Sequence, residues 1–112
     1  MANGKITKLR LESAPTGKMG QKYLASGENL ALRMWDEEPH TPVQPPTSRD
    51  YETVGYVISG RAELHADGQV IELEQGDSWV VPKGASHTYK IVEPFTAAEA
   101  TYPAAREAGR DQ

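Results

Sequence analysis

One histidine stands out in this sequence as a side chain able to transfer protons or bind a metal. His87 closes the stretch GDSWVVPKGASH, which begins at Gly76. An imidazole suits both roles, because its ordinary pKa lies near neutral pH and its ring nitrogens are common metal ligands. The chain has three histidines and no cysteine. Disulfides, thiolate metal sites and thiol redox chemistry are therefore excluded, and any metal would depend on oxygen and imidazole ligands.

Length and charge set the broad class of protein. A chain of 112 residues predicts a single domain covering 1–112. The net charge of −4, without a basic stripe, argues against nucleic-acid binding. The longest apolar runs fall far short of the roughly 20 residues that a membrane helix needs, so no membrane partner is expected. The N-terminal residues MANGKITKLRLE contain no apolar signal-peptide core, so we expect a cytoplasmic protein.

Short apolar segments separated by turn residues must position this histidine. Eight prolines and ten glycines punctuate the chain, and turn signals recur about every 8–12 residues, which predicts an all-β sandwich or barrel. Asp67-Gly68 is the clearest hairpin turn, because a type I′ turn needs positive φ at both central residues. The segments expected to form strands are 5–12, 30–35, 54–59, 62–65, 70–74, 79–81 and 87–92.

Three other segments have distinct compositions. Residues 1–28 are expected to form N-terminal strands or an arm. Residues 36–50 hold four of the eight prolines and predict a long extended loop, a kind of segment that is often functional. The acidic run Asp36-Glu37-Glu38 is expected to be a solvated face of this loop. The polar tail 103–112 is expected to be loosely held.

Two motifs around the central hairpin resemble those of the cupin superfamily. The second cupin motif is matched in spacing by four residues, namely Gly76, Pro82, Gly84 and His87. Its final asparagine is replaced here by Ile91. The stretch that starts at Tyr51 and closes on Gly60 resembles the first motif. The resemblance covers about residues 45–95 and implies a cupin-type jelly-roll β-barrel, with the motif-bearing barrel core at 51–95.

The resemblance also implies where metal ligands would lie. In metal-binding cupins the first motif supplies two histidines and a glutamate, and the second supplies one histidine. The glutamate position corresponds to Thr53. The two histidine positions correspond to Thr47 and Arg49, or to Pro46 and Ser48 if the spacing is one residue longer. Zinc and iron sites generally need three or four protein ligands, so no cofactor is expected. The alternative is a divalent metal held by His87 together with His40, Asp50 and Glu52. Glu52 is displaced by one residue from the motif position, which in a strand turns a side chain to the opposite face.

Strand alternation places His87 on one face with Tyr89 and Ile91. One reading is an ordinary core histidine that hydrogen-bonds a neighbouring hydroxyl or carbonyl. The resemblance favours a cavity-lining residue, since ligand sites often lie in barrel mouths. Arg49 has a fork geometry suited to carboxylates, although it could instead pair with Asp50 or Glu52 at the surface. The candidate ligand-binding residues are His87, Arg49, Thr47, Tyr51, Thr53, Tyr89 and Trp79.

The first-motif strand gives two conflicting predictions of its inner face. Periodicity points Val54, Tyr56 and Ile58 into the core. The resemblance instead sends inward the alternate set Tyr51, Thr53, Gly55, Val57 and Ser59. Both hold if the other face is covered by an N-terminal strand or by a second subunit, and a homodimer is expected.

Together these features predict a cupin barrel that binds a small organic ligand, either an acid or a sugar derivative, in its interior without a tightly bound metal. Whether it is an enzyme is left open. One alternative is a metal-free isomerase, epimerase or lyase, with His87 as the catalytic acid–base and Tyr51 or Tyr89 assisting. The other is a divalent-metal enzyme of dioxygenase type with the non-standard ligand set given above.

Overall fold

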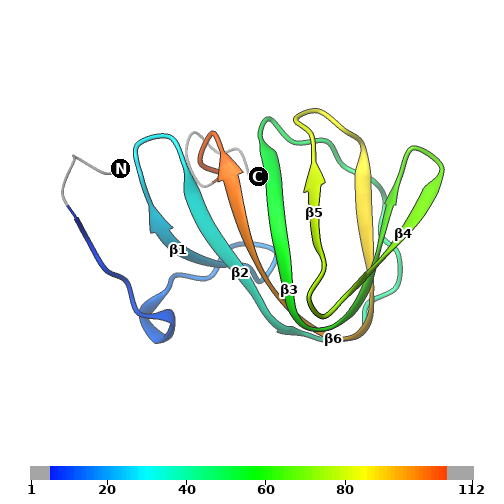
Figure 1. The fold of residues 1–112 in the computed structure, drawn as a ribbon, viewed down its shortest axis with the longest axis horizontal. Helices are drawn as coiled ribbons and strands as arrows, with labels where there is room; N and C mark the ends of the chain where they lie inside the picture. Colours follow the sequence, from blue (N-terminus) through cyan, green and yellow to red (C-terminus); the bar gives the residue numbers. More distant parts are fainter. Residues whose placement is uncertain (1–5, 106–112) are drawn as a thin grey trace.

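The chain folds into antiparallel β-structure, as the sequence predicts. The computed structural model describes residues 6–105, and in this range it has six strands and one short 3-10 helix, Leu11–Ser13. The strands form one sheet in the order β1-β2-β6-β3-β4, with β5 also paired to β3 (Figure 1). Their bounds are β1 Lys22–Ser26, β2 Ala31–Glu38, β3 Glu52–Ala66, β4 Gln69–Glu74, β5 Ser78–Val81 and β6 His87–Tyr102.

Two long, bent strands turn this sheet into a jelly roll. β3 and β6 pair from Ala66↔His87 to Glu52↔Tyr102, and the register shifts several times between Val57 and Ala62. At this bend Gly60 has φ +85°, and a Cβ there would overlap the Pro94 carbonyl oxygen. Only glycine fits such a position. Each long strand therefore contributes to both halves of the fold, as Figure 1 shows where β3 and β6 curve along the lower edge of the molecule.

The central hairpin forms as predicted. Asp67 has φ 52° and Gly68 has φ 73°, the positive values that a two-residue type I′ turn requires. The flanking residues Ala66 and Gln69 pair directly. This hairpin brings β4 back onto β3 and fixes the register between the two motifs.

Several predicted strand limits are wrong. Residues 54–59 and 62–65 belong to the single strand β3, and 87–92 is only the first part of β6. Residues 6–10 form no strand, and the N-terminal arm contributes β1 instead. The apolar side chains of that first segment find no sheet to cover, since Ile6 is fully exposed and Leu9 and Leu11 are exposed by about two-fifths.

The proline-rich segment is extended but starts later than predicted. Asp36, Glu37 and Glu38 lie in β2, not in a solvated loop. Beyond them the loop runs along β6 through two isolated bridges, Thr41↔Ile91 and Thr47↔His87. Backbone hydrogen bonds join the second pair at 2.8 and 2.9 Å. The loop thereby acts as an extra edge beside the histidine.

The beginning of the C-terminal tail is held more firmly than predicted. Ala104 and Ala105 are buried, and the Ala105 backbone N–H donates a 2.9 Å hydrogen bond to Thr101 Oγ1. The rest of the predicted tail, residues 106–112, lies outside the described residues. No helix within 6–105 is long and apolar enough to cross a membrane.

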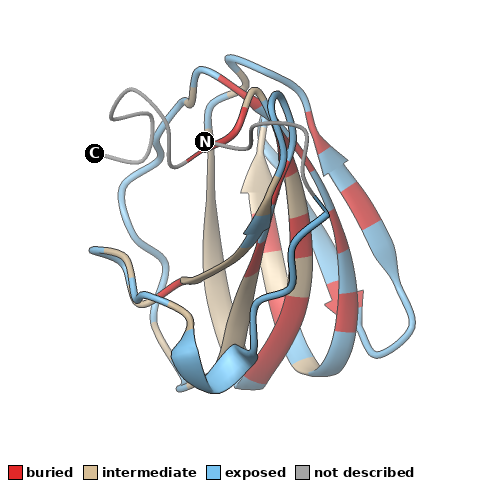
Figure 2. Cartoon of the chain, turned by 90° about the vertical axis from the view of Figure 1, so that its left-hand side faces the viewer, coloured by how far each residue is buried: buried red, intermediate tan, exposed pale blue. Residues whose placement is uncertain are grey.

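The resemblance, not the simple periodicity, gives the correct inner face of β3. Tyr51, Thr53 and Val57 are buried, whereas Val54 and Tyr56 are each 52% exposed. Figure 2 shows this alternation as red and blue bands along the strands. Ser59 departs from the prediction and is exposed, because the register shifts on both sides of it. The opposite face of β3, which carries Val54, Tyr56 and Ile58, is not covered by the described N-terminal residues.

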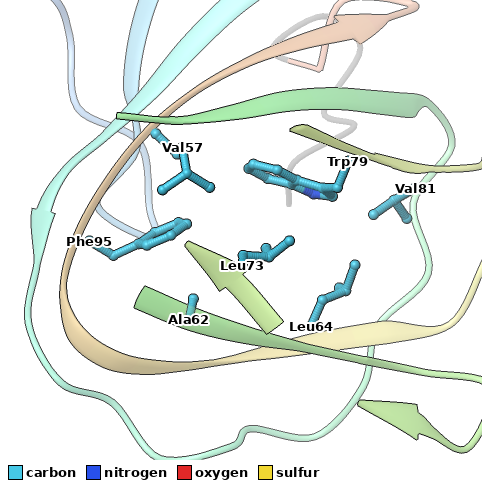
Figure 3. Packing of buried hydrophobic residues seen from close by; sticks show 8 residues of the cluster. Val57, Ala62, Leu64, Leu73, Trp79, Val81 and Phe95 are labelled. Atoms are coloured by element: carbon cyan, nitrogen blue, oxygen red, sulfur yellow. The ribbon is translucent and has the colours of Figure 1, made fainter. Parts of the chain in front are cut away.

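Apolar side chains fill one part of the barrel interior. The buried cluster comes from β3, β4, β5 and β6 and consists of Val57, Ala62, Leu64, Leu73, Trp79, Val81, Phe95 and Ala97 (Figure 3). Gly55 makes room for the Trp79 ring, which a Cβ at that position would overlap. Tyr89 and Ile91 pack at the margin of this core, and on their other side the interior is hollow.

Candidate functional site

The hollow is a cavity of about 290 Å³ whose wall includes residues of β2, β3, β6, the proline-rich loop and the N-terminal arm. Its lining includes six of the seven residues that the sequence suggested for ligand binding: Thr47, Arg49, Tyr51, Thr53, His87 and Tyr89. They come from separate segments. The bridge between Thr47 and His87 and the β3–β6 ladder bring these segments together.

Trp79 does not line the cavity. Its ring belongs to the apolar core, and its Nε1–H donates a 3.2 Å hydrogen bond to the Tyr89 hydroxyl. Trp79 therefore lies behind the cavity lining and contacts it through Tyr89, which differs from its predicted place among the ligand-binding residues. Side chains alternate between the two faces of β5, and Trp79 lies on the inward face with Val81.

The His87 ring is oriented by a backbone carbonyl. Its Nδ1 lies 3.0 Å from the Ala85 carbonyl oxygen. A carbonyl can only accept, so in the neutral ring Nδ1 carries the hydrogen and Nε2 is the basic nitrogen. Tyr89 packs edge-on against the ring, with 5.6 Å between centroids. His87 is half-buried and lines the cavity, so it is not a fully enclosed core residue.

A buried ion pair in the cavity wall was not predicted. Arg33 Nε lies 2.7 Å from Glu99 Oε1, and Arg33 Nη1 donates to the Tyr51 hydroxyl at 3.2 Å. The guanidinium also lies over two aromatic rings, 5.5 Å from the Trp35 centroid and 5.4 Å from the Tyr51 centroid. The sequence held one signal of this pair: Arg33 alternates with the apolar residues Ala31 and Trp35, which puts a charge on an inward face. Its partner is 66 positions away in the sequence.

The Tyr89 hydroxyl lies in the same buried region. Burial raises the pKa of Tyr89 far above its ordinary value, and the nearby Glu99 carboxylate raises it further. The hydroxyl is therefore neutral across the physiological pH range. It accepts from Trp79 and keeps its own hydrogen available for donation.

Glu38 is a second carboxylate at the cavity that was not predicted from the sequence. It lines the cavity from the end of β2. Burial raises the pKa of Glu38, Lys22 lowers it by charge attraction, and Asp36 raises it by repulsion. Its presence in the wall was hidden in the sequence because it belongs to a run of three acidic residues.

The N-terminal arm supplies part of the cavity wall through Met19. Gln21 is completely buried, and its Oε1 accepts a 2.9 Å hydrogen bond from the Met19 backbone N–H. Its Nε2 donates to the Tyr23 hydroxyl at 3.2 Å. Arg49 Nη2 lies 3.4 Å from Met19 Sδ. Gln21 thus fixes a turn that covers the cavity near Arg49.

The residues of this cavity do not fit a cupin-type metal centre. The positions matched to ligands, Thr47, Arg49 and Thr53, surround one cavity as predicted, and none offers an imidazole or carboxylate. Glu99 is already paired with Arg33. Within residues 6–105 no three histidine, aspartate or glutamate side chains are grouped so that they could hold a metal ion.

The alternative metal set is not assembled either. His40 and Glu52 are exposed and absent from the cavity lining. Asp50 pairs with Lys83, with 3.4 Å between Oδ1 and Nζ. Glu52 lies on the outer face of β3, as its displacement by one residue from the motif position implies.

Comparison with known proteins gives a consistent family assignment. The model of the cupin domain matches residues 33–99. No curated protein matches the chain in sequence. Among solved structures, an RmlC-like cupin from Shewanella frigidimarina NCIMB 400 superposes with a TM-score of 0.76 at 20% identity, covering 92% of this chain and 95% of that one.

Two further structures share the fold at low identity. KdgF from Halomonas sp. has a TM-score of 0.64 at 24% identity and covers 74% of this chain and 76% of its own. The polyketide cyclase RemF from Streptomyces resistomycificus has a TM-score of 0.66 at 17% identity, with 87% and 78% covered. At these identities the likeness concerns the fold alone.

Proposed function

The chain belongs to the cupin superfamily, and from that premise we propose that it binds a small organic anion in its barrel cavity without a tightly bound metal. The observation that carries this proposal is the cavity of about 290 Å³, which lies where the two cupin motifs meet. Ligand pockets usually have volumes of roughly 300–1,000 Å³. The cavity of about 290 Å³ lies just below this range and suits a small molecule.

Aromatic walls would provide most of the binding free energy. Trp35, Tyr51, Tyr89 and Phe95 all line the cavity. Burial of apolar ligand surface against such rings is favourable by about 25 cal/mol per Å² before the entropy of association is subtracted. The ligand is therefore expected to have a compact apolar body.

Arg49 supports the anionic character of the ligand. Its guanidinium lines the cavity beside Met19, and a planar fork of donors binds carboxylate or phosphate well. The other cavity arginine, Arg33, forms an ion pair with Glu99. Arg49 enters the cavity wall from the proline-rich loop, at a position that the cupin motif assigns to a metal ligand.

A second candidate function is metal-free acid–base catalysis, an isomerase, epimerase or lyase step. The orientation of His87 favours it, since the contact with the Ala85 carbonyl leaves Nε2 as the basic nitrogen. Tyr89 would then be a neutral hydrogen-bond donor nearby. The cyclase RemF gives one example of an enzyme with this fold.

The proposal is tested with matched neutral and anionic probes. Small carboxylates, such as benzoate and phenylacetate, are titrated against their carboxamides while NMR shifts of the cavity residues are followed. We expect the carboxylates to bind more tightly, and Arg49→Gln to remove the preference. Arg61→Gln is the control, because Arg61 pairs with Glu93 on the exposed side of β3. Failure of every carboxylate to perturb the cavity would refute ligand binding.

A second measurement distinguishes an enzyme from a binding protein. A bound compound is recovered after incubation and compared with the starting material. Unchanged recovery, with His87→Ala altering only affinity, favours a binding protein. Conversion that disappears in His87→Ala favours the enzyme.

The uncovered sheet face supports a homodimer. On the outside of the sheet, one row of directly paired residues is wholly apolar: Leu32, Ala100, Val54 and Val80. Tyr56 continues it and is 52% exposed. An uncharged apolar row of this kind can pack against a second copy of itself about a two-fold axis. Such a dimer in the cytoplasm remains our proposal for assembly and location.

A further inference from the structure

A β-bulge reverses the direction of one side chain at the end of β2. Arg33 and Trp35 both line the cavity, so regular alternation would place residue 37 inward and residue 38 outward. Instead Trp35 pairs with Ala97 and Glu38 pairs with Phe95. One extra residue is therefore inserted in β2, and the Glu38 side chain lines the cavity.

The bulge is held at the expense of an unfavourable backbone conformation. Glu37 has φ +55°, a left-handed value that favours glycine or asparagine over a long side chain. Its backbone N–H donates a 2.9 Å hydrogen bond to the buried Thr96 Oγ1. Strained conformations of this kind often occur at functional sites, where bulges redirect side chains.

The surroundings of Glu38 suit a ligand contact. A Cβ on Gly20 would lie 3.4 Å from Glu38 Oε2, so the N-terminal turn packs closely beside the carboxylate. Lys22 on β1 and Asp36 on β2 are the charged groups that act on it, and burial is the largest influence, raising its pKa. Arg49 contacts the adjacent residue of the same turn, Met19. Glu38 and Arg49 therefore flank one turn at the cavity.

We propose that Glu38 is a specificity-determining residue of the cavity, which hydrogen-bonds a hydroxyl or amino group of the ligand while Arg49 holds the anionic group. The ligand class is then a small hydroxy acid or amino acid with an apolar body. This inference rests on the proposed ligand-binding function. It adds a second polar requirement to the single anionic group proposed above.

The test compares acids that differ by one donor group. The probes are lactate with propionate, mandelate with phenylacetate, and 2-aminobenzoate with benzoate, each titrated against the full chain by NMR. In at least one pair we expect the hydroxy or amino acid to bind about tenfold more tightly, as a hydrogen bond to a charged group allows. Glu38→Ala should abolish that preference without weakening the simple acid.

Control variants distinguish the effect of the Glu38 carboxylate from the effects of neighbouring residues. Asp36→Asn removes a nearby charge that does not line the cavity and should keep the preference. Glu38→Gln preserves the size of the side chain and shows whether the fold is retained. Thr96→Val removes the acceptor that holds the bulge and should reduce the preference.

The outcomes distinguish this inference from the proposed function. If the acids bind but no pair shows a preference, or if Glu38→Ala keeps it, the role of Glu38 is refuted and ligand binding stands. If none of the acids binds, both fail.

Discussion

Arg33 and Glu99 form a buried ion pair across two neighbouring strands, with 2.7 Å between Nε and Oε1 and side chains only 9% and 2% exposed. β2 and β6 place them directly opposite each other. Two aromatic rings and the Tyr51 hydroxyl also lie against the guanidinium. Both residues line the cavity, so the ion pair helps to hold the cavity wall together.

Removal of one partner should leave the other charge buried and unpaired. Arg33→Met is expected to destabilise the protein by about 3–5 kcal/mol, measured by urea denaturation. Arg33→Met combined with Glu99→Leu should be less destabilised than Arg33→Met alone, and strictly additive effects would contradict this account. Arg61→Met is the control, since the Arg61–Glu93 pair is exposed and such pairs contribute at most about 1 kcal/mol.

Gly55 should tolerate no side chain while Trp79 is present. A Cβ there would overlap the outer ring atoms of Trp79, and Gly55→Ala is expected to cost about 1–3 kcal/mol of unfolding free energy, as overpacking does. Trp79→Phe removes those atoms, so the double variant should recover part of the loss. Gly27→Ala, with only an ordinary contact at 3.4 Å, should have little effect. Equal losses at both glycines would count against the steric explanation.

Glu38 should make the stability depend on pH in the weakly acidic range. Because burial raises the pKa of Glu38 in the folded state, its favourable contribution is present below the unfolded pKa of about 4.3 and is lost as pH rises through the folded value. Glu38→Gln cannot ionise and should therefore gain stability relative to the parent chain between pH 4 and 7. Urea denaturation of the parent chain and of Glu38→Gln at pH 4 and at pH 7 measures this difference in unfolding free energy. A difference that stays constant with pH would show that Glu38 does not titrate as described.

The outer face of β3 should control assembly. Val54→Lys or Tyr56→Lys places a charge on the uncovered apolar face and is expected to convert a dimer into a monomer, as measured by sedimentation velocity. Val70→Lys is the matched control, because Val70 is also exposed but lies on β4. A monomeric parent chain would overturn the dimer proposal.

The all-β class and the central hairpin could be predicted because they depend on local chemistry. The residue types of Asp67-Gly68 favour the positive φ of a type I′ turn, and the short apolar segments alternate within the length of a single strand. The ends of strands were less predictable. The residues at 59–61 do not show that the predicted strands 54–59 and 62–65 are one continuous strand. Their continuity depends on β6, which bends together with β3 at Gly60.

The candidate cavity residues on the motif strands could be placed from spacing, and Trp79 could not. Spacing and alternation give the face of a residue, but whether that face borders a cavity or a packed core depends on neighbours from other strands. Trp79 faces inward as Tyr89 does, yet Leu73 and Phe95 fill the space around it.

The sequence by itself determined the strand-rich class, the hairpin, the family motifs and the loss of donors at the motif's ligand positions, because these depend on residue types and short spacings. Only the tertiary structure decided that Arg33 meets Glu99 and that a bulge turns Glu38 into the cavity. Ion pairs between distant strands and the insertion of one extra residue are set by register, and register is fixed by the packing of the whole sheet.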